Sequence, residues 1–199
     1  MLKKLSLFLV VCVFSVTAIG FAPEIYSVDA AHSNVGFSIP ILNGLSQVRG
    51  KFTDFKIDVE YDEADITKSK VKAVIKATSI DTGIERRDAH LRTPDFFEVE
   101  KYPDITFEST RIEKKGKDFV AHGTFSMHGV VKEIAIPFKA NGHFVSEENK
   151  QKMLGFTGTM DLNRRDYGIN YQNRSNPTFI GDMVHIELFV LLRPPRPAQ

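Results

Sequence analysis

Thiol chemistry is nearly absent from this sequence. The 199 residues include one cysteine and no tryptophan, so the aromatic content consists of phenylalanine and tyrosine. Cys12 lies inside an apolar N-terminal stretch with the features of a leader peptide. Removal of that stretch leaves a mature chain with no thiol, which excludes disulfide bonds and thiolate catalysis.

Neither sign of charge is in excess. Lysine and arginine number 26 and aspartate and glutamate 25, which gives a net charge of +1. Loss of Lys3 and Lys4 with the leader would change that charge to −1. A nucleic-acid-binding surface needs a basic excess, so we expect no nucleic-acid partner. No second apolar run is long enough to span a membrane.

Residues 1–20 have the layout of a secretory signal peptide. A short basic region precedes an apolar run from Leu5 to Ile19, and the small residues Ala18 and Gly20 suit cleavage after Gly20. An uncleaved membrane anchor is the alternative, although the run is shorter than the roughly 20 apolar residues of a typical span. The sequence therefore predicts a mature protein that is periplasmic or secreted.

Residues 21–193 are predicted to form one β-rich domain, followed by a Pro-rich tail over residues 194–199. Apolar and polar residues alternate in many short runs, as in half-buried strands. Turn signals such as His128-Gly129 separate the runs. About eight such strands indicate an antiparallel barrel or a sandwich, and closure into a barrel would remove exposed sheet edges.

Two of these runs change phase. The run from Phe52 to Val59 slips near Thr53, which suggests a β-bulge. The run from Lys70 to Ala77 slips once as well, so its inward face is ambiguous.

The connection over residues 79–107 is more complex than a hairpin loop. Thr82 and Glu85 have the spacing of a capping box, which predicts a short helix that begins after Thr82. A helix of about eight residues is marginal alone, so it must be docked. The expected apolar anchors are Leu91, Phe96 and Phe97.

Two polar clusters are candidates for chemistry or for ligand contact. Asp88 and His90, beside Arg86 and Arg87, could cap and hold the helix, contact a ligand head group, or act as an acid/base pair. Residues two apart on a helix do not face each other, which favours the structural role. Arg165 and Tyr167 could form a charge-paired turn or part of a ligand rim. The six histidines show no metal-ligand spacing, and no nucleophile elbow is present, so we expect neither a metal site nor catalytic residues.

Aromatic side chains recur on the apolar faces of the predicted strands. Such a stripe is often ordinary core, but an eight-stranded barrel is just wide enough either to pack solid or to hold one small ligand. Phe-rich walls would suit a long apolar guest. The expected tunnel lining is Phe37, Phe52, Val74, Phe96, Phe107, Phe125, Met127, Phe138 and Phe156, and the expected head-group contacts are Arg86, Asp88, His90, Arg165 and Tyr167.

Several motifs occur in one order across nearly the whole mature chain. They are Tyr26-Ser27-Val28-Asp29, His32-Ser33-Asn34-Val35-Gly36-Phe37, Ser79-Ile80-Asp81-Thr82-Gly83, Arg87-Asp88-Ala89-His90-Leu91, Asp95-Phe96-Phe97, Tyr102-Pro103-Asp104-Ile105-Thr106-Phe107, His128-Gly129-Val130 and Arg165-Asp166-Tyr167-Gly168. In these motifs the chain resembles the YceI-like family of secreted polyisoprenoid-binding proteins.

The resemblance implies an all-β, lipocalin-like antiparallel barrel of about eight strands, with a short helix in one connection and a tunnel for an isoprenoid chain. It implies an isoprenoid lipid or isoprenoid quinone as the bound ligand, no required cofactor, transient membrane contact and no family-wide catalysis. The sequence does not decide whether the protein forms a homodimer. Relatives often carry a basic residue and a histidine after the strand of Phe37, where this chain has Pro40-Ile41-Leu42-Asn43-Gly44.

Two other functions remain open from the sequence. One is a hydrolase or isomerase for an apolar substrate, with Asp88 and His90 as acid and base. The other is a barrel with a solid core that acts through protein contacts and binds no lipid.

Overall fold

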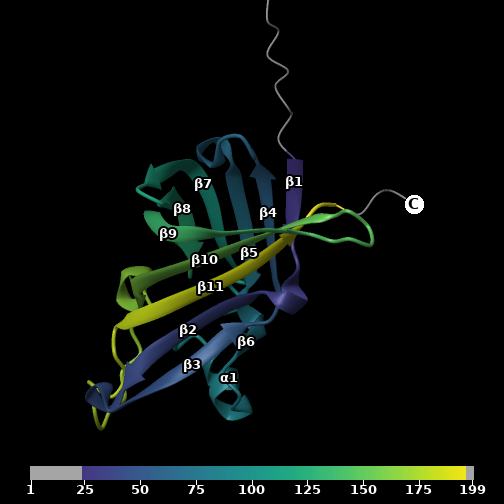
Figure 1. Ribbon diagram of the computed structural model, residues 1–199. Helices are drawn as coiled ribbons and strands as arrows, with labels where there is room; N and C mark the ends of the chain where they lie inside the picture. Colours follow the sequence, from purple (N-terminus) through teal and green to yellow (C-terminus); the bar gives the residue numbers. More distant parts are fainter. Residues whose placement is uncertain (1–23, 196–199) are drawn as a thin grey trace, which may run out of the picture.

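The computed structural model describes residues 24–195, which form a closed antiparallel barrel with one α-helix (Figure 1). The predicted signal peptide lies outside the described residues, as do residues 196–199 of the predicted tail. The barrel strands, in spatial order, are β1 (Glu24–Val28), β4 (Phe55–Tyr61), β5 (Lys70–Lys76), β7 (Asp104–Lys115), β8 (Asp118–Met127), β9 (Val130–Val145), β10 (Lys152–Asn163) and β11 (Met183–Arg193). Pairing of β1 with β11 closes the circle, which confirms the predicted eight-stranded barrel.

Three further strands extend the sheet beyond the barrel. Only the last residues of β11 pair with the short β1, whereas residues 185–189 of β11 pair with β2 (Asn34–Ile41). β2 pairs in turn with β3 (Ser46–Phe52), whose end pairs with β6 (Ile80–Asp81). Figure 1 shows β2 and β3 continuing the sheet of β10 and β11 away from β1, towards α1 (Glu85–Leu91).

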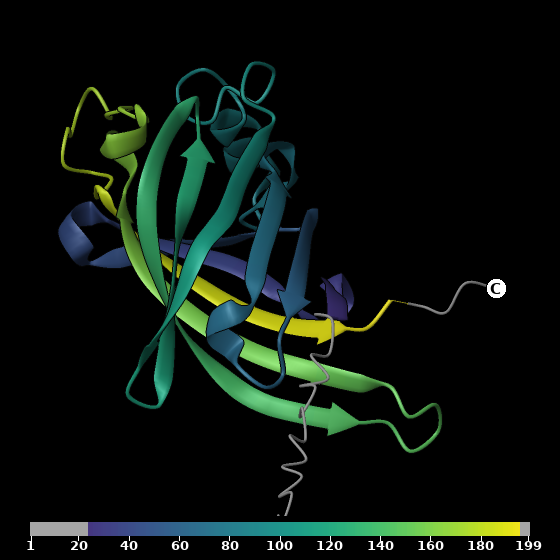
Figure 2. The same ribbon diagram turned by 90° about the horizontal axis from the view of Figure 1, so that it is seen from above.

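β9 also changes partner along its length. It pairs with β8 from Val130 to Phe138 and with β10 from Phe138 to Val145. The second half of β10, after Gly158, pairs with β11 alone. The wall therefore parts between the first half of β9 and the second half of β10, where the strands diverge in Figure 2.

Short 3₁₀ helices connect several strands. They are η1 (Ala30–His32), η2 (Leu42–Gly44), η3 (Ile66–Lys68), η4 (Ala77–Ser79) and η5 (Arg164–Tyr167). Within residues 24–195, no helix has the length and apolar character needed to cross a membrane.

The alternating patterns predict the strands well. Along β11, Val184, Ile186, Leu188 and Val190 face the interior, while the residues between them are mostly charged or exposed. The predicted turn at His128-Gly129 is a two-residue hairpin with positive φ at both positions, 52° and 76°. Such angles match the twist of antiparallel strands.

The predicted bulge near Thr53 is wrong. Thr53 and Asp54 form a bend that ends β3 and starts β4, and these strands belong to different parts of the sheet. The change of phase marks a change of pairing partner, since β3 pairs with β2 and β4 pairs with β1. Irregular pairing occurs instead in β7, between Ser109 and Arg111, and in β10, between Gly155 and Phe156.

Substitution of Gly123 by alanine should destabilise the barrel. A Cβ at Gly123 in β8 would lie 2.2 Å from the carbonyl oxygen of Glu108, which is backbone of the paired strand and cannot rotate away. We expect Gly123→Ala to lower the free energy of unfolding by about 2 kcal/mol, as other overpacked sites do. Urea unfolding of the parent and the variant measures this difference in the free energy of unfolding.

Gly155→Ala is the matched control. A Cβ at Gly155 would meet its nearest neighbour, the Cβ of Asn141, at 3.5 Å, which is an ordinary contact. Equal losses of stability in the two variants would contradict the steric explanation.

Candidate functional site: an apolar cavity inside the barrel

The barrel encloses a cavity of about 570 Å³. Its walls come from the inward faces of β2, β3, β4, β5, β7, β8, β9, β10 and β11. Along β11 every second residue from Val184 to Leu192 lines it, a length of about 27 Å at the rise of a β-strand. The interior is a long apolar chamber, which contradicts the alternative of a barrel with a solid core.

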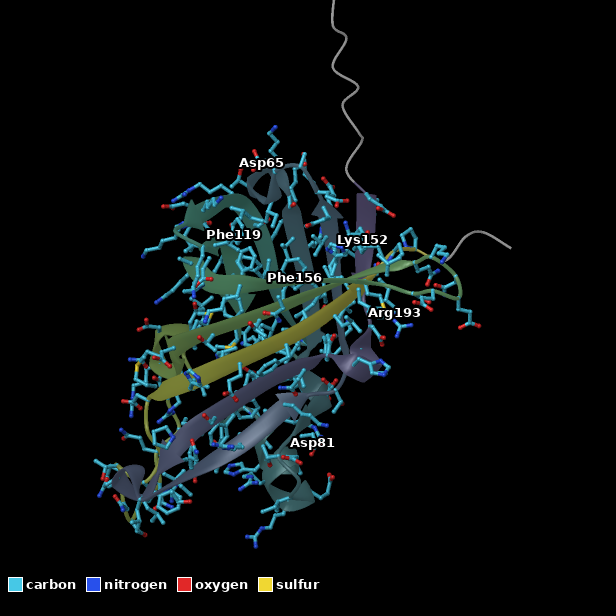
Figure 3. The ribbon with its side chains drawn as sticks, in the orientation of Figure 1. Asp65, Asp81, Phe119, Lys152, Phe156 and Arg193 are labelled. Atoms are coloured by element: carbon cyan, nitrogen blue, oxygen red, sulfur yellow. The ribbon has the colours of Figure 1, made fainter. Side chains whose placement is uncertain are left out.

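The predicted aromatic lining agrees largely with the cavity walls. Of the nine residues, eight line the cavity: Phe37, Phe52, Phe96, Phe107, Phe125, Met127, Phe138 and Phe156. Several of their rings pack edge to face, such as Phe138 and Phe156 at 6.0 Å between centroids. Figure 3 shows Phe119 and Phe156 in the upper half of the barrel. Phe37, Phe125, Phe138 and Phe156 are only half-buried although they face inward, because the interior is not filled.

Val74 is the incorrect member of the predicted lining. β5 pairs with β4 and β7 in a regular register, so its side chains alternate without the expected slip. Val71, Ala73 and Ile75 line the cavity and Val74 does not. Because Ala73, Val74 and Ile75 are all apolar, the sequence pattern does not show which face of this strand points inward.

The cap over residues 79–107 packs against one end of the barrel. As expected, Phe96 belongs to the buried core, with Leu91 and Phe97 packed against it. The predicted capping box is wrong, since α1 begins at Glu85 with Ile84 as its N-cap and no side-chain capping bond.

Thr82 has a different partner from the one expected. Its backbone N–H donates to Asp88 Oδ1 at 3.0 Å, and its hydroxyl donates to the same oxygen. Arg87 Nε donates to the Thr82 hydroxyl oxygen at 2.6 Å and Arg87 Nη2 to the Thr82 carbonyl at 2.8 Å. Asp88 is buried and fastens the start of the cap to the helix, which makes it a structural residue.

Asp88 and His90 are not brought together as an acid/base pair. The partner of His90 is Asp95, with 2.8 Å between Nε2 and Oδ2. The imidazole also packs at 5.1 Å from each of the rings of Phe96 and Tyr171. His90 lines the cavity, whereas Arg86 is exposed and does not.

The predicted rim at Arg165 and Tyr167 is part of η5, which covers the gap between β9 and β10. Tyr167 is buried, its ring lies 5.4 Å from that of Phe125, and its carbonyl accepts a hydrogen bond from His128 Nδ1 at 2.9 Å. Lys132 on β9 forms an ion pair with Asp166 at 3.3 Å. Neither Arg165 nor Tyr167 lines the cavity, so these two residues act in the wall.

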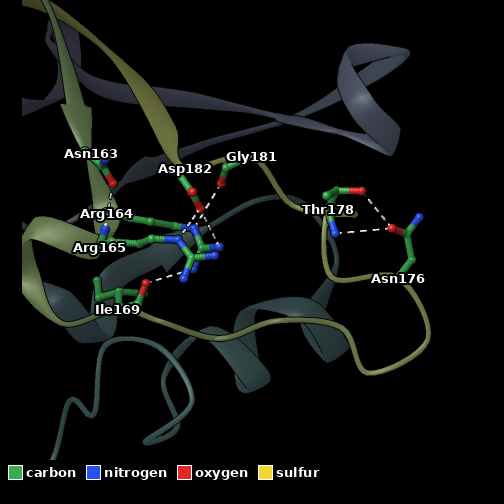
Figure 4. A network of polar contacts seen from close by, with 8 residues as sticks. All are labelled: Asn163, Arg164, Arg165, Ile169, Asn176, Thr178, Gly181 and Asp182. Carbon is green, nitrogen blue, oxygen red and sulfur yellow. Dashed lines mark hydrogen bonds and ion pairs between the residues drawn. The ribbon is translucent and has the colours of Figure 1, made fainter.

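Arg164, next to the predicted Arg165, is the buried cation of this region and lines the cavity. Its guanidinium donates to the carbonyls of Gly181 (2.9 Å) and Ile169 (2.8 Å) and to Asp182 Oδ1 (3.0 Å), as Figure 4 shows. These bonds hold both ends of the loop between η5 and β11. Burial lowers the pKa of Arg164 from its usual value, and the bonds to Asp182 and the carbonyls offset that cost.

Few other polar groups reach the cavity. Tyr61 lines it near β1, and burial raises the pKa of its phenol. Burial likewise raises the pKa of Tyr167 in the wall. Burial therefore favours the neutral phenols of Tyr61 and Tyr167. Within residues 24–195, no group of three His, Cys, Asp or Glu side chains is placed to hold a metal ion.

Sequence reasoning missed the contribution of the loop before β11. Tyr171, Asn173, Phe179 and Ile180 line the cavity, and so does Arg87. Ile169 of the same loop lines it too. The loop has no strand periodicity, so only its two aromatic residues and its two isoleucines could have suggested contact with an apolar interior.

Comparisons with known proteins agree with this barrel. A model of the YceI-like domain matches residues 26–191. The chain belongs to the YceI-like family. A UPF0312 protein of Shewanella baltica is 37% identical over 145 residues, which cover 71% of this chain and 73% of the relative. A UPF0312 protein of Vibrio parahaemolyticus is 33% identical over 170 residues, 83% of this chain and 86% of the relative.

Solved structures share the YceI-like fold. Burkholderia cenocepacia BcnA superposes with a TM-score of 0.73 at 20% identity, over 82% of this chain and 98% of BcnA. The Campylobacter jejuni YCEI protein gives 0.67 at 27% identity, over 76% and 88% of the two chains. A polyisoprenoid binding domain from Saccharophagus degradans, implicated in plant cell wall breakdown, gives 0.63 at 18% identity, over 85% and 98%.

Removal of the buried Arg164 cation should cost more stability than removal of its neighbour. Arg164 is 3% exposed, and Arg164→Met would remove the donors to the buried Ile169 carbonyl and the part-buried Gly181 carbonyl, so we expect the free energy of unfolding to fall by about 3 kcal/mol. Arg165→Met removes one half-exposed ion pair with Asp182 and should cost less than about 1 kcal/mol. Urea unfolding of both variants tests the order, and a reversed order would contradict it.

Proposed function

We propose that this YceI-like protein binds a long-chain isoprenoid, a polyprenyl lipid or an isoprenoid quinone, inside the barrel cavity. The observation that carries the proposal is the unbroken apolar lining along β11, from Val184 to Leu192. A chamber of that length suits an extended hydrocarbon chain better than a compact ligand. The related structure that is called a polyisoprenoid binding domain supports the same class of ligand.

Apolar burial alone would give strong binding. Transfer of hydrocarbon from water contributes roughly 0.8 kcal/mol per buried CH₂, so a chain of several isoprene units needs few hydrogen bonds. The lining offers mostly Phe, Ile, Val and Leu side chains. An isoprenoid bound there would be shielded from water, and the protein could sequester it or carry it between a membrane and the soluble phase.

His90 is the head-group contact that we retain. Of the five residues predicted from the sequence, it is the one that lines the cavity. Tyr171 lies against it and lines the cavity too. We propose that the head group lies near this pair, at the α1 end, with the chain extending into the barrel.

We also propose that the protein works in the periplasm after cleavage following Gly20. The basic start and the apolar run of residues 1–20 support export. The intact mass of protein released by osmotic shock should correspond to a chain that begins at Phe21. A mass that includes residues 1–20 in a membrane fraction would contradict the proposal and favour an uncleaved anchor.

Native mass spectrometry of protein from its own host tests ligand binding directly. We expect a bound mass that survives gentle ionisation, and organic extraction of the same sample should yield a polyprenyl lipid or quinone. Protein that is empty and does not bind added isoprenoid quinone would overturn the proposal. His90→Ala, assayed alongside, should weaken affinity, because His90 lines the cavity at the proposed head-group end; unchanged affinity with loss of a turnover activity would favour the enzyme hypothesis instead.

A pair of neighbouring substitutions on β5 tests the location. Ala73→Phe places a ring inside the cavity, whereas Val74→Phe places the same ring on the outer face. Displacement of two or three CH₂ groups by the Ala73→Phe ring should cost about 2 kcal/mol, or roughly thirty-fold in affinity. Val74→Phe should leave the affinity unchanged. Fluorescence titration with an isoprenoid quinone measures both, and equal effects would place the ligand elsewhere.

A further inference from the structure

The tip of the β2–β3 hairpin exposes two leucines that make no contribution to the core. Leu45 is 85% exposed and Leu42 is 42% exposed. We call residues 40–48 the hairpin tip. An isolated apolar residue on a surface needs no explanation, but two at one projecting turn beside a cavity indicate contact with an apolar partner.

The backbone of the hairpin tip holds the leucines outward. Leu42, Asn43 and Gly44 have φ angles of 54°, 57° and 88°, a left-handed conformation that a leucine adopts only at a cost. Hydrogen bonds from Leu42 N–H to the Phe179 carbonyl and from Gly181 N–H to the Pro40 carbonyl, both 2.8 Å, fasten the tip to the loop before β11. The exposed leucines therefore belong to a fixed surface.

The apolar surface of the hairpin tip continues into the cavity. Ile41 and Val48, on the two strands next to the exposed leucines, line the cavity wall. Phe179 and Ile180, on the loop fastened to the tip, line it as well, and Ile41 and Ile180 form a β-bridge. A hydrocarbon chain could pass from the outer leucines to the inner lining over apolar side chains alone.

The charged side chains on the hairpin tip and on the loop fastened to it have one sign, and Asp95 of the cap, which lines a surface pocket with Arg174, is paired with His90. Residues 40–50 and 168–181 contain Arg49 and Arg174 and no aspartate or glutamate. Both arginines are exposed, and within residues 24–195 neither has a carboxylate at ion-pair distance. Asp182, the next acidic residue along the chain, is already paired with Arg164 and Arg165. This charge complements an anionic surface.

We propose that the hairpin tip inserts Leu42 and Leu45 into the surface of an anionic phospholipid bilayer and forms the route by which the isoprenoid enters or leaves the cavity. This proposal rests on isoprenoid binding in the cavity. The four-residue apolar passage of Ile41, Val48, Phe179 and Ile180 joins the bilayer to the tunnel.

Co-sedimentation with vesicles of phosphatidylethanolamine and phosphatidylglycerol tests the proposal on the mature chain. The double variant Leu42→Asn, Leu45→Gln should partition at least about ten-fold less than the parent, given the usual contribution of a buried leucine. Asparagine tolerates the left-handed backbone, so the variant should fold. A rise in salt should also weaken binding to the anionic vesicles by screening Arg49 and Arg174.

The β9–β10 hairpin provides a matched control. This hairpin projects to the right in Figure 1, away from β2 and β3, and Phe144 and Val145 at the end of β9 are 62% and 44% exposed. The double variant Phe144→Gln, Val145→Gln removes a comparable exposed apolar surface and should partition like the parent. Loss of partitioning in this control but not in the tip variant would overturn the proposal.

A second assay separates this proposal from the one on which it rests. Affinity for an isoprenoid quinone in detergent micelles should be the same in the parent and the tip variant, while transfer of the quinone from vesicles slows at least about ten-fold. Parent protein that binds quinone in micelles but ignores vesicles overturns docking and leaves cavity binding intact. Parent protein that binds vesicles through the tip but no quinone overturns cavity binding. A dimer that the tip variant abolishes would show that a second copy covers the leucines, and would also overturn docking.

Discussion

The pairing of β11 with two different neighbours is the constraint on which the rest of this structure depends. Its last residues close the barrel against β1, and its middle pairs with β2. A strand with one partner along this edge would give either a short closed barrel or an open sheet. Because β11 shares one edge between β1 and β2, the wall of the barrel continues along β2 and β3. The interior is therefore long in proportion to its width.

That length prevents the interior from being filled. The inward side chains of β2, β9 and β11 meet others across the lumen only in part, so large residues such as Phe37 and Phe138 face inward and stay half-buried. Protein cores are normally packed as densely as organic crystals, and an unfilled apolar interior forgoes that stabilisation. A ligand that supplies the missing contacts would stabilise the folded state in proportion to its concentration. The cavity thus links stability to binding.

Buried polar anchors at the wall and the cap allow irregular segments to complete an apolar chamber. Arg164 satisfies two carbonyls at the ends of the loop before β11, and Asp88 satisfies Thr82 at the start of the cap. Loops carry backbone groups that are costly to bury without partners. With these groups satisfied, the loop and the cap can present Tyr171, Phe179 and Phe96 to the interior. The polar residues that looked like candidates for chemistry in the sequence serve mainly this purpose.

The sequence by itself determined the strands, most inward faces and the family. Nine lining residues were predicted and eight line the cavity; seven of these eight lie on strands, where period-two alternation predicts the inward face because one face of each strand must be apolar, and the eighth, Phe96, lies in the cap. The alternation failed at Val74, where both faces carry apolar residues, and at Thr53, where one run of residues supplies two strands. Only the tertiary structure decided which polar residues reach the cavity. Arg164 rather than Arg165 reaches the cavity because η5 docks against the distant residues Gly181 and Asp182, which local spacing does not specify. Asp95 rather than Asp88 is the partner of His90 because the chain turns back after α1, whereas Asp88 bonds to Thr82.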